Sequence, residues 1–276
     1  ASTIWTSGSV ERVAMAAAPM LAVRDAPPAS GRFPVIIYAP SYAASADENA
    51  DLCEYLASHG YIVVSSGSRG ARYKTMTDDL EGIEAQAADI AFLTAYAQTL
   101  PGADTSRTAA VGFSWGGISN VVAAARTNRI HALVSLAGSI RSYPHLLAPA
   151  KARPPANPPV PMLSIGTRPE PRERLLESDT STTVSYLNKM KYSDVYLATM
   201  HPMDHMNFAG RMLRTTGDGD FKDYTREEVA TAYNWTVRYV TEFLDAHLKK
   251  DPGALAFLKK SPLENGVPRH LMSFEA

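Results

Sequence analysis

The residues best suited to chemistry lie in one segment, Gly112-Phe113-Ser114-Trp115-Gly116, which has the pattern Gly-x-Ser-x-Gly. An apolar stretch, 108–113, precedes the serine, and a run of small residues typical of a packed helix, 115–126, follows it. In a sharp turn between a strand and a helix, the two glycines leave room for a strained serine backbone. Free N–H groups at the helix N-terminus then favour developing negative charge. The pattern predicts that Ser114 is a nucleophile; the structural alternative is a glycine-rich turn with a serine N-cap.

A serine that attacks a carbonyl group needs N–H donors for the oxyanion that forms. In a fold built on this turn, one donor belongs to the residue after the nucleophile, here Trp115. The second comes from the loop after an early strand, and the apolar stretch 33–38 is that strand. We expect the backbone amides of Trp115 and Tyr42 to form the oxyanion hole, with Ser41 as the alternative to Tyr42.

A serine nucleophile also needs a general base. The chain has 7 histidines, and in this fold the catalytic one follows the last strand of the sheet, after the serine and the acid. Only His201 and His205 lie in the loop directly after the strand expected at 194–199. His201 precedes Pro202 directly, which favours a role in holding the loop. We therefore expect His205 to be the base, because a neutral imidazole accepts a hydroxyl proton near pH 7.

The carboxylate that orients the histidine should follow the strand expected at 161–165. Glu170 is the first acidic residue after that strand, and Glu173 and Asp179 are alternatives. Each of the three also fits a solvated charge on a loop. The sequence thus predicts the triad Ser114, His205 and Glu170.

Four residues are candidates for substrate binding. Tyr42, Trp115 and Tyr143 supply rings that suit the wall of an acyl or aromatic pocket, although packing is the alternative explanation. Arg69 follows the strand expected at 61–65 and could meet an acidic group of the substrate; the alternative is a surface arginine. The histidines and acidic residues fit no metal-ligand spacing, so we expect neither a metal nor a cofactor.

Strands and helices alternate along the chain, which predicts an α/β fold with a mostly parallel sheet and helices on both faces. Together with the serine turn, this is the α/β-hydrolase fold. We expect a single domain over 1–276, with a proline-rich excursion at about 141–160 and a packing tail at about 250–276. Strands are expected at 4–24, 33–38, 61–65, 108–113, 130–137, 161–165 and 194–199. Helices are expected at 47–59, 78–99, 115–126, 181–190 and 225–249.

The composition suits an enzyme that acts on a small molecule. The chain has 276 residues, is 45% hydrophobic and carries a net charge of −1 from 27 basic and 28 acidic residues. This balance excludes the charge footprint of a nucleic-acid-binding protein. No apolar run approaches the roughly 20 residues of a membrane span. We expect a monomer or small homo-oligomer with a small-molecule ester as its partner.

Cellular location is read from the cysteine count and the first residues. Cys53 is the only cysteine, so no intrachain disulfide forms, which fits the cytosol without forbidding export. The chain starts with Ala1 rather than Met, as it would after signal-peptide cleavage or trimming. We expect a periplasmic or secreted protein, with the cytoplasm as the alternative.

Three segments resemble one family. They are Pro40-Ser41-Tyr42-Ala43, 56–61 (Leu-Ala-Ser-His-Gly-Tyr) and 112–117 (Gly-Phe-Ser-Trp-Gly-Gly), and they occur in order and at similar spacing in dienelactone-hydrolase-like α/β hydrolases. Within that group the chain looks most like the bacterial cutinase and polyester-hydrolase branch and the platelet-activating-factor acetylhydrolase-like branch. The resemblance covers about 30–250. It implies a serine esterase in which the aromatic residue of His-x-x-Phe, here Phe208, packs beneath the imidazole of His205.

The chain departs from these relatives at three places. Pro40-Ser41-Tyr42 stands where they usually have Pro-Gly-Tyr. The cutinase-type enzymes generally carry a disulfide near the C-terminus, which a lone Cys53 cannot form. The family usually has Asp about three residues after the glycine that ends the strand, but Pro169 stands there.

These features predict a serine esterase that works through an acyl-enzyme. Two alternatives remain open. One is peptide or amide cleavage by the same residues, and the other is a binding protein of this fold that has lost catalysis, for which the missing Asp near 169 is the support.

Overall fold

A computed structural model describes residues 20–72, 74–140, 143–147, 149–150, 159–168, 186–221 and 223–276. Its centre is a seven-stranded sheet in the order β2-β1-β3-β4-β5-β6-β7. Every neighbouring pair is parallel except β6 and β7, which are antiparallel. The strands are β1 (Phe33–Ala39), β2 (Ile62–Ser65), β3 (Ala103–Phe113), β4 (Ala132–Leu136), β5 (Met162–Thr167), β6 (Val195–Met200) and β7 (Met272–Glu275).

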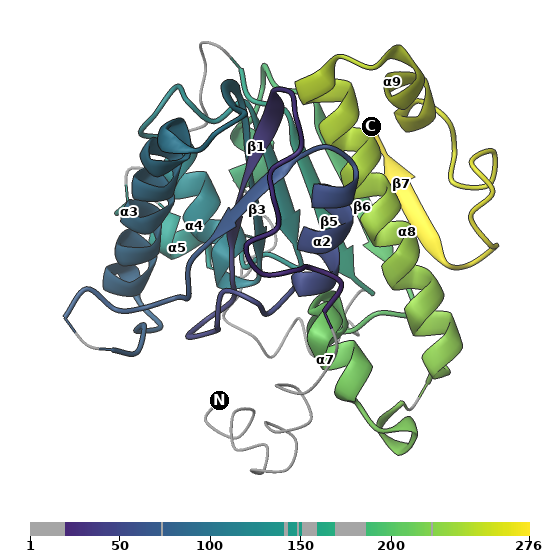
Figure 1. Ribbon diagram of the computed structural model, residues 1–276. Coiled ribbons are helices and arrows are strands. Elements are labelled where there is room, and N and C mark those ends of the chain that lie inside the picture. The colour runs from purple at the N-terminus through teal and green to yellow at the C-terminus, as the bar shows by residue number, and fades with distance from the viewer. Residues whose placement is uncertain are drawn as a thin grey trace.

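Helices cover both faces of the sheet (Figure 1). One face packs against α2 and α8, and the other packs against α3 and α4. The α-helices are α2 (Ala50–Ser58), α3 (Leu80–Tyr96), α4 (Trp115–Ala124), α5 (Pro144–Leu147), α7 (Gly210–Thr215), α8 (Arg226–Leu244) and α9 (Pro252–Leu258). Short 3₁₀ turns are η1 (Ala97–Thr99), η2 (Tyr186–Lys189), η3 (His205–Phe208) and η4 (Asp218–Asp220), and a π turn, η5 (Asp245–Lys249), extends α8.

Strand β1 shows why this sequence forms a sheet buried on both faces. Side chains of a strand point alternately to opposite faces. Ile36 and Tyr38 enter the core beneath α2 and α8, whereas Val35 and Ile37 enter the core beneath α3 and α4. All four are at most 1% exposed. Both faces of the strand are therefore buried, which explains why its sequence is a near-continuous apolar run.

The predicted α/β-hydrolase architecture is confirmed, and the strands expected between 33 and 199 all occur within a few residues of their predicted ends. One element prediction is wrong: residues 20–24, the described part of the strands expected at 4–24, form no strand. The packing tail expected at about 250–276 contains α9 and the edge strand β7, two elements that the sequence analysis did not predict. Of the helix expected at 181–190, the described part is the short turn η2.

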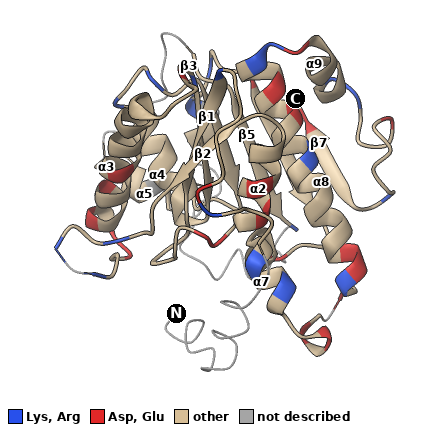
Figure 2. Ribbon diagram, in the orientation of Figure 1, with Lys and Arg blue, Asp and Glu red and all other residues tan. Residues whose placement is uncertain are grey.

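Basic and acidic residues are mixed over the helices and connecting loops, whereas the central sheet carries few of either (Figure 2). Among the described residues, no helix combines the length and apolar character that crossing a membrane requires.

Candidate active site

Strand β3 ends in a sharp turn at Ser114. Its backbone has φ 53° and ψ −117°, a region that residues other than glycine rarely adopt. A side chain at Gly116 would overlap the carbonyl oxygen of Ala39, and one at Gly112 would overlap the carbonyl group of Gly116. The two glycines therefore let β3, the start of α4 and the end of β1 approach closely enough to form the turn.

The turn is fixed by backbone hydrogen bonds on both sides of the serine. The Ser114 N–H donates to the carbonyl of Leu136 at 3.0 Å, and the Ser114 carbonyl accepts from Gly117 at 3.0 Å and from Ser139 at 3.2 Å. Ser114 is only 6% exposed, so its hydroxyl lies in a fixed position at the edge of the sheet.

The structure brings His205 to this serine. The imidazole Nε2 lies 2.9 Å from Oγ of Ser114, within hydrogen-bond distance. His205 is the first residue of η3, which follows β6, so two segments 91 residues apart meet at one edge of the sheet. The adjacent Asp204 caps η3 by accepting the N–H groups of Met206 and Asn207, and this cap fixes the point at which the histidine leaves the backbone.

The surroundings of the ring favour its neutral form. Partial removal from water lowers the pKa of His205 below its ordinary value of 6.5, and the negative charge of Asp204 opposes this shift. The ring of Phe113 lies 5.1 Å from the imidazole. Phe208, expected beneath the imidazole, is fully buried in the core beneath α8, so the ring recorded beside His205 is a different one from the ring that the resemblance implies.

The oxyanion loop, residues 39–42, lies against the start of α4. The N–H of Ser41 donates to a carboxylate oxygen of Glu48 at 2.8 Å, which rules Ser41 out as a free donor in this conformation. Within the described residues, no acceptor is recorded for the N–H of Tyr42 or of Trp115. The oxyanion hole formed by Tyr42 and Trp115 stays a prediction.

Three rings predicted for a substrate pocket stand in a row beside the serine. The ring centroids of Tyr42 and Trp115 are 6.1 Å apart, and those of Trp115 and Tyr143 are 5.4 Å apart. Trp115, the middle ring, is 8% exposed, Tyr42 is partly buried and Tyr143 is 36% exposed, so both outer rings are partly open to solvent. This arrangement suits contact with an apolar or aromatic group of a substrate.

Two other candidates lie apart from the nucleophile. Arg69 is exposed on the loop after the edge strand β2, where its guanidinium donates to the carbonyl of Lys74 at 3.3 Å. The N–H of His201 donates to the carbonyl of Leu271 at 3.0 Å, so this residue helps to join the end of β6 to the C-terminal segment. A substrate role for Arg69 stays a prediction.

The carboxylate expected to orient the imidazole of His205 also remains a prediction. Glu170, Glu173 and Asp179 all lie outside the described residues. In the described part of the chain, no carboxylate is recorded in hydrogen-bond contact with Nδ1 of His205.

Sequence reasoning missed Glu48 and Asn49, which directly precede α2 and lie behind the site. Asn49 is fully buried, and its side chain donates to the carbonyl of Phe208 at 3.0 Å. Its side-chain oxygen accepts from the N–H of Gly210 and the hydroxyl of Tyr233, at 3.0 and 2.7 Å. Asn49 therefore anchors the segment that carries the catalytic candidate His205. The sequence shows a polar run, 47–49, before an apolar helix, but it does not indicate that Glu48 and Asn49 are buried.

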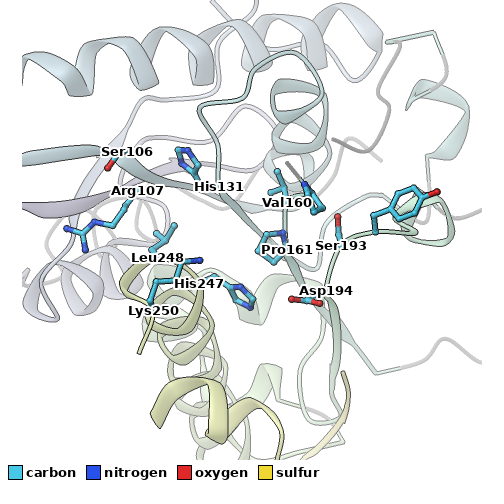
Figure 3. Close-up of a pocket in the computed structure, with 12 residues that line it drawn as sticks. Ser106, Arg107, His131, Val160, Pro161, Ser193, Asp194, His247, Leu248 and Lys250 are labelled. Atoms are coloured by element: carbon cyan, nitrogen blue, oxygen red, sulfur yellow. The ribbon is translucent and has the colours of Figure 1, made fainter. Parts of the chain in front are cut away.

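The pocket in Figure 3 lies at the opposite edge of the sheet. His131, Pro161 and Asp194 line it, and they directly precede β4, β5 and β6. Its Arg107 is paired with Asp104 at 2.7 Å. Ligand sites of open parallel sheets lie at the carboxyl ends of the strands, so this pocket is separate from the Ser114 site. Among the described residues, no cluster of three or more His, Cys, Asp or Glu side chains could hold a metal ion.

Comparisons with known proteins also point to a hydrolase. The sequence profile of the X-Pro dipeptidyl-peptidase (S15 family) matches residues 20–205. No curated protein sequence matches the chain. The structure resembles a ferulic acid esterase from Streptomyces cinnamoneus, with a TM-score of 0.67 and 21% identity over 91% of this chain and 76% of that chain. It also resembles DcsB, solved with a substrate analogue, with a TM-score of 0.53 and 15% identity over 80% of this chain and 92% of that chain.

At these identities the two structures establish the fold, and they agree with the α/β-hydrolase architecture of the sheet. The profile that matches is not that of the dienelactone-hydrolase-like branch, so the resemblance is confirmed for the α/β hydrolases in general and not for that branch.

Proposed function

This chain is a member of the S15 (X-Pro dipeptidyl-peptidase) family of serine hydrolases, and from that premise we propose that it cleaves carboxylic esters with Ser114 as its nucleophile. The observation that carries the proposal is the 2.9 Å contact between Oγ of Ser114 and Nε2 of His205 at a strained turn. A serine used only as an N-cap has no need of an imidazole at this distance.

The proposed reaction has two halves. In acylation, Nε2 of His205 accepts the hydroxyl proton as Oγ of Ser114 attacks the ester carbonyl, and the N–H groups of Tyr42 and Trp115 stabilise the oxyanion. The proton then passes from His205 to the departing alcohol, which leaves an acyl group on Ser114. In deacylation, His205 activates a water molecule that releases the carboxylic acid. Glu170 is the proposed partner of Nδ1, with Glu173 and Asp179 as alternatives.

In the part of the chain that the structure describes, the carboxylates beside the site support esters over peptides. An enzyme that removes an X-Pro dipeptide has to bind the free α-amino group of its substrate, for which an acidic side chain is the natural partner. Glu48 is already bonded to Ser41, and Asp204 is bonded to two backbone N–H groups of η3. The aromatic row of Tyr42, Trp115 and Tyr143 instead offers apolar contacts to an acyl group.

The second candidate function is X-Pro dipeptide release, which the family match favours. A direct test compares p-nitrophenyl acetate and Ala-Pro-p-nitroanilide on the wild type and on Ser114→Ala. The proposal predicts higher kcat/KM for the ester, and its loss in the variant. A higher kcat/KM for the anilide refutes the ester assignment, and equal ester turnover in both proteins refutes the role of Ser114. A wild type inert to both substrates and to a fluorophosphonate supports the catalytically inactive alternative.

A further inference from the structure

Buried side chains hold the carbonyl end of the peptide unit that joins Pro40 to Ser41. The carbonyl oxygen of Pro40 accepts from Nε2 of Gln86 at 2.8 Å and from the hydroxyl of Ser68 at 3.3 Å. Gln86 and Ser68 are 2% and 3% exposed, and they contact each other at 2.6 Å. Two buried donors thus converge on the carbonyl oxygen of Pro40 and fix its orientation.

A buried carboxylate holds the other end of the same peptide unit. One oxygen of Glu48 accepts the N–H of Ser41 at 2.8 Å, and the other accepts the Ser41 hydroxyl. Glu48 is 7% exposed, and its burial raises its pKa to about 7. Burying a carboxylate is unfavourable, and the two hydrogen bonds that Ser41 donates to Glu48 offset part of this cost.

The orientation of the Pro40–Ser41 peptide unit sets that of the next unit, which joins Ser41 to Tyr42. The carbonyl of Ser41 accepts the N–H of Ala44 at 3.3 Å. Because a trans peptide is planar, the N–H of Tyr42 points to the opposite side from that carbonyl. The contact between Gly116 and Ala39 places this loop against the start of α4, next to Ser114.

We propose that Glu48 is a positioning residue for the proposed ester hydrolysis: through Ser41 it aims the N–H of Tyr42 at the oxyanion that forms above Ser114. The inference rests on the proposed function. Glu48 does not contact the substrate, and its effect on the reaction passes through the orientation of one peptide unit.

The test measures p-nitrophenyl acetate kinetics for the wild type, Glu48→Leu, Glu48→Gln and a control, Glu54→Gln. Leucine fills the space and removes both acceptors, whereas glutamine keeps an acceptor for the Ser41 N–H. Glu54 lies on α2, the helix that Glu48 precedes, and its side chain accepts the N–H of Ala22 outside the site. Because the oxyanion forms only in the transition state, we expect Glu48→Leu to lower kcat about ten- to hundredfold with KM within about twofold. Glu48→Gln should recover most of kcat, and Glu54→Gln should match the wild type.

Inhibition by phenylboronic acid separates positioning from a general loss of structure. Its tetrahedral adduct on Ser114 places an oxygen where the oxyanion forms, so the Ki should rise in Glu48→Leu by the factor by which kcat/KM falls. Should the leucine variant not fold, Glu48→Asp replaces it, since the shorter side chain cannot reach both Ser41 donors; an intermediate loss of kcat is then expected. Wild-type kcat in Glu48→Leu or Glu48→Asp, or an effect on KM alone, overturns this inference while leaving the proposed function intact. A wild type without Ser114-dependent turnover overturns both.

Discussion

Replacing Glu48 by glutamine should make the free energy of unfolding less dependent on pH. The buried carboxyl has a pKa of about 7 in the folded protein, against an ordinary value of 4.5. The folded state therefore binds the proton more tightly than the unfolded state between these values. The contribution of Glu48 to the free energy of unfolding is accordingly highest below pH 4.5 and is lost as the pH rises through 7.

The size of the effect follows from the two pKa values. At about 1.4 kcal/mol per pKa unit, the full change is about 3.5 kcal/mol, of which about 2.5 kcal/mol falls between pH 5 and pH 8. Glutamine occupies nearly the same volume and does not ionise. The titratable side chains that face Glu48, Tyr38 and Asp47, are the same in both proteins, so their contributions largely cancel in the difference.

Urea unfolding of the wild type and Glu48→Gln at pH 5, 6, 7 and 8 measures this difference. The variant should gain stability relative to the wild type as the pH rises, by about 2.5 kcal/mol across the range. The control Glu54→Gln, on the helix α2 that follows Glu48, should stay within about 0.5 kcal/mol of the wild type at each pH. A difference that is constant with pH, or that shrinks as the pH rises, would show that burial does not govern the ionisation of Glu48.

Three further predictions concern the proposed reaction. Gly116→Ala should lower kcat for p-nitrophenyl acetate at least about a hundredfold, because the added carbon overlaps the carbonyl of Ala39 and displaces the oxyanion loop; a kcat within threefold of the wild type in a folded variant contradicts this. The acidic limb of kcat/KM should have its midpoint below pH 6.5, because partial burial lowers the pKa of His205 and the neutral form is the base; a midpoint at 7 or above is inconsistent with that base. Tyr143→Ala removes the outer ring beside Trp115. It should raise KM for p-nitrophenyl benzoate about three- to tenfold and leave KM for p-nitrophenyl acetate unchanged. Equal effects on the two esters would mean that the ring does not line the acyl pocket.

The candidate nucleophile and the candidate base could be placed from the sequence because each depends on local or topological rules. A strained turn needs glycine on both sides of Ser114, and the order of elements leaves few histidines after the last parallel strand. The structure brings Ser114 and His205 together as expected. The acid could not be chosen in the same way, because Glu170, Glu173 and Asp179 all follow one strand and nothing local distinguishes them.

Glu48 was missed for a different physical reason. A glutamate at the start of a helix is usually a solvated charge that interacts favourably with the helix dipole. Its burial here results from the oxyanion loop folding over it, which is a tertiary event without a local signal. Strand β7 was missed because four residues at an antiparallel edge carry little pattern, and their partner β6 lies about 70 residues earlier.

The central claim is that the hydroxyl of Ser114 is activated by the imidazole of His205. Peptide mapping by mass spectrometry after treatment with a fluorophosphonate tests it most directly, with Ser114→Ala and His205→Ala treated in parallel. The account predicts one adduct, located on Ser114, that is absent from the first variant and forms at least about a hundredfold more slowly in the second. An unmodified wild type, an adduct on another residue, or equal rates with and without His205 would contradict it.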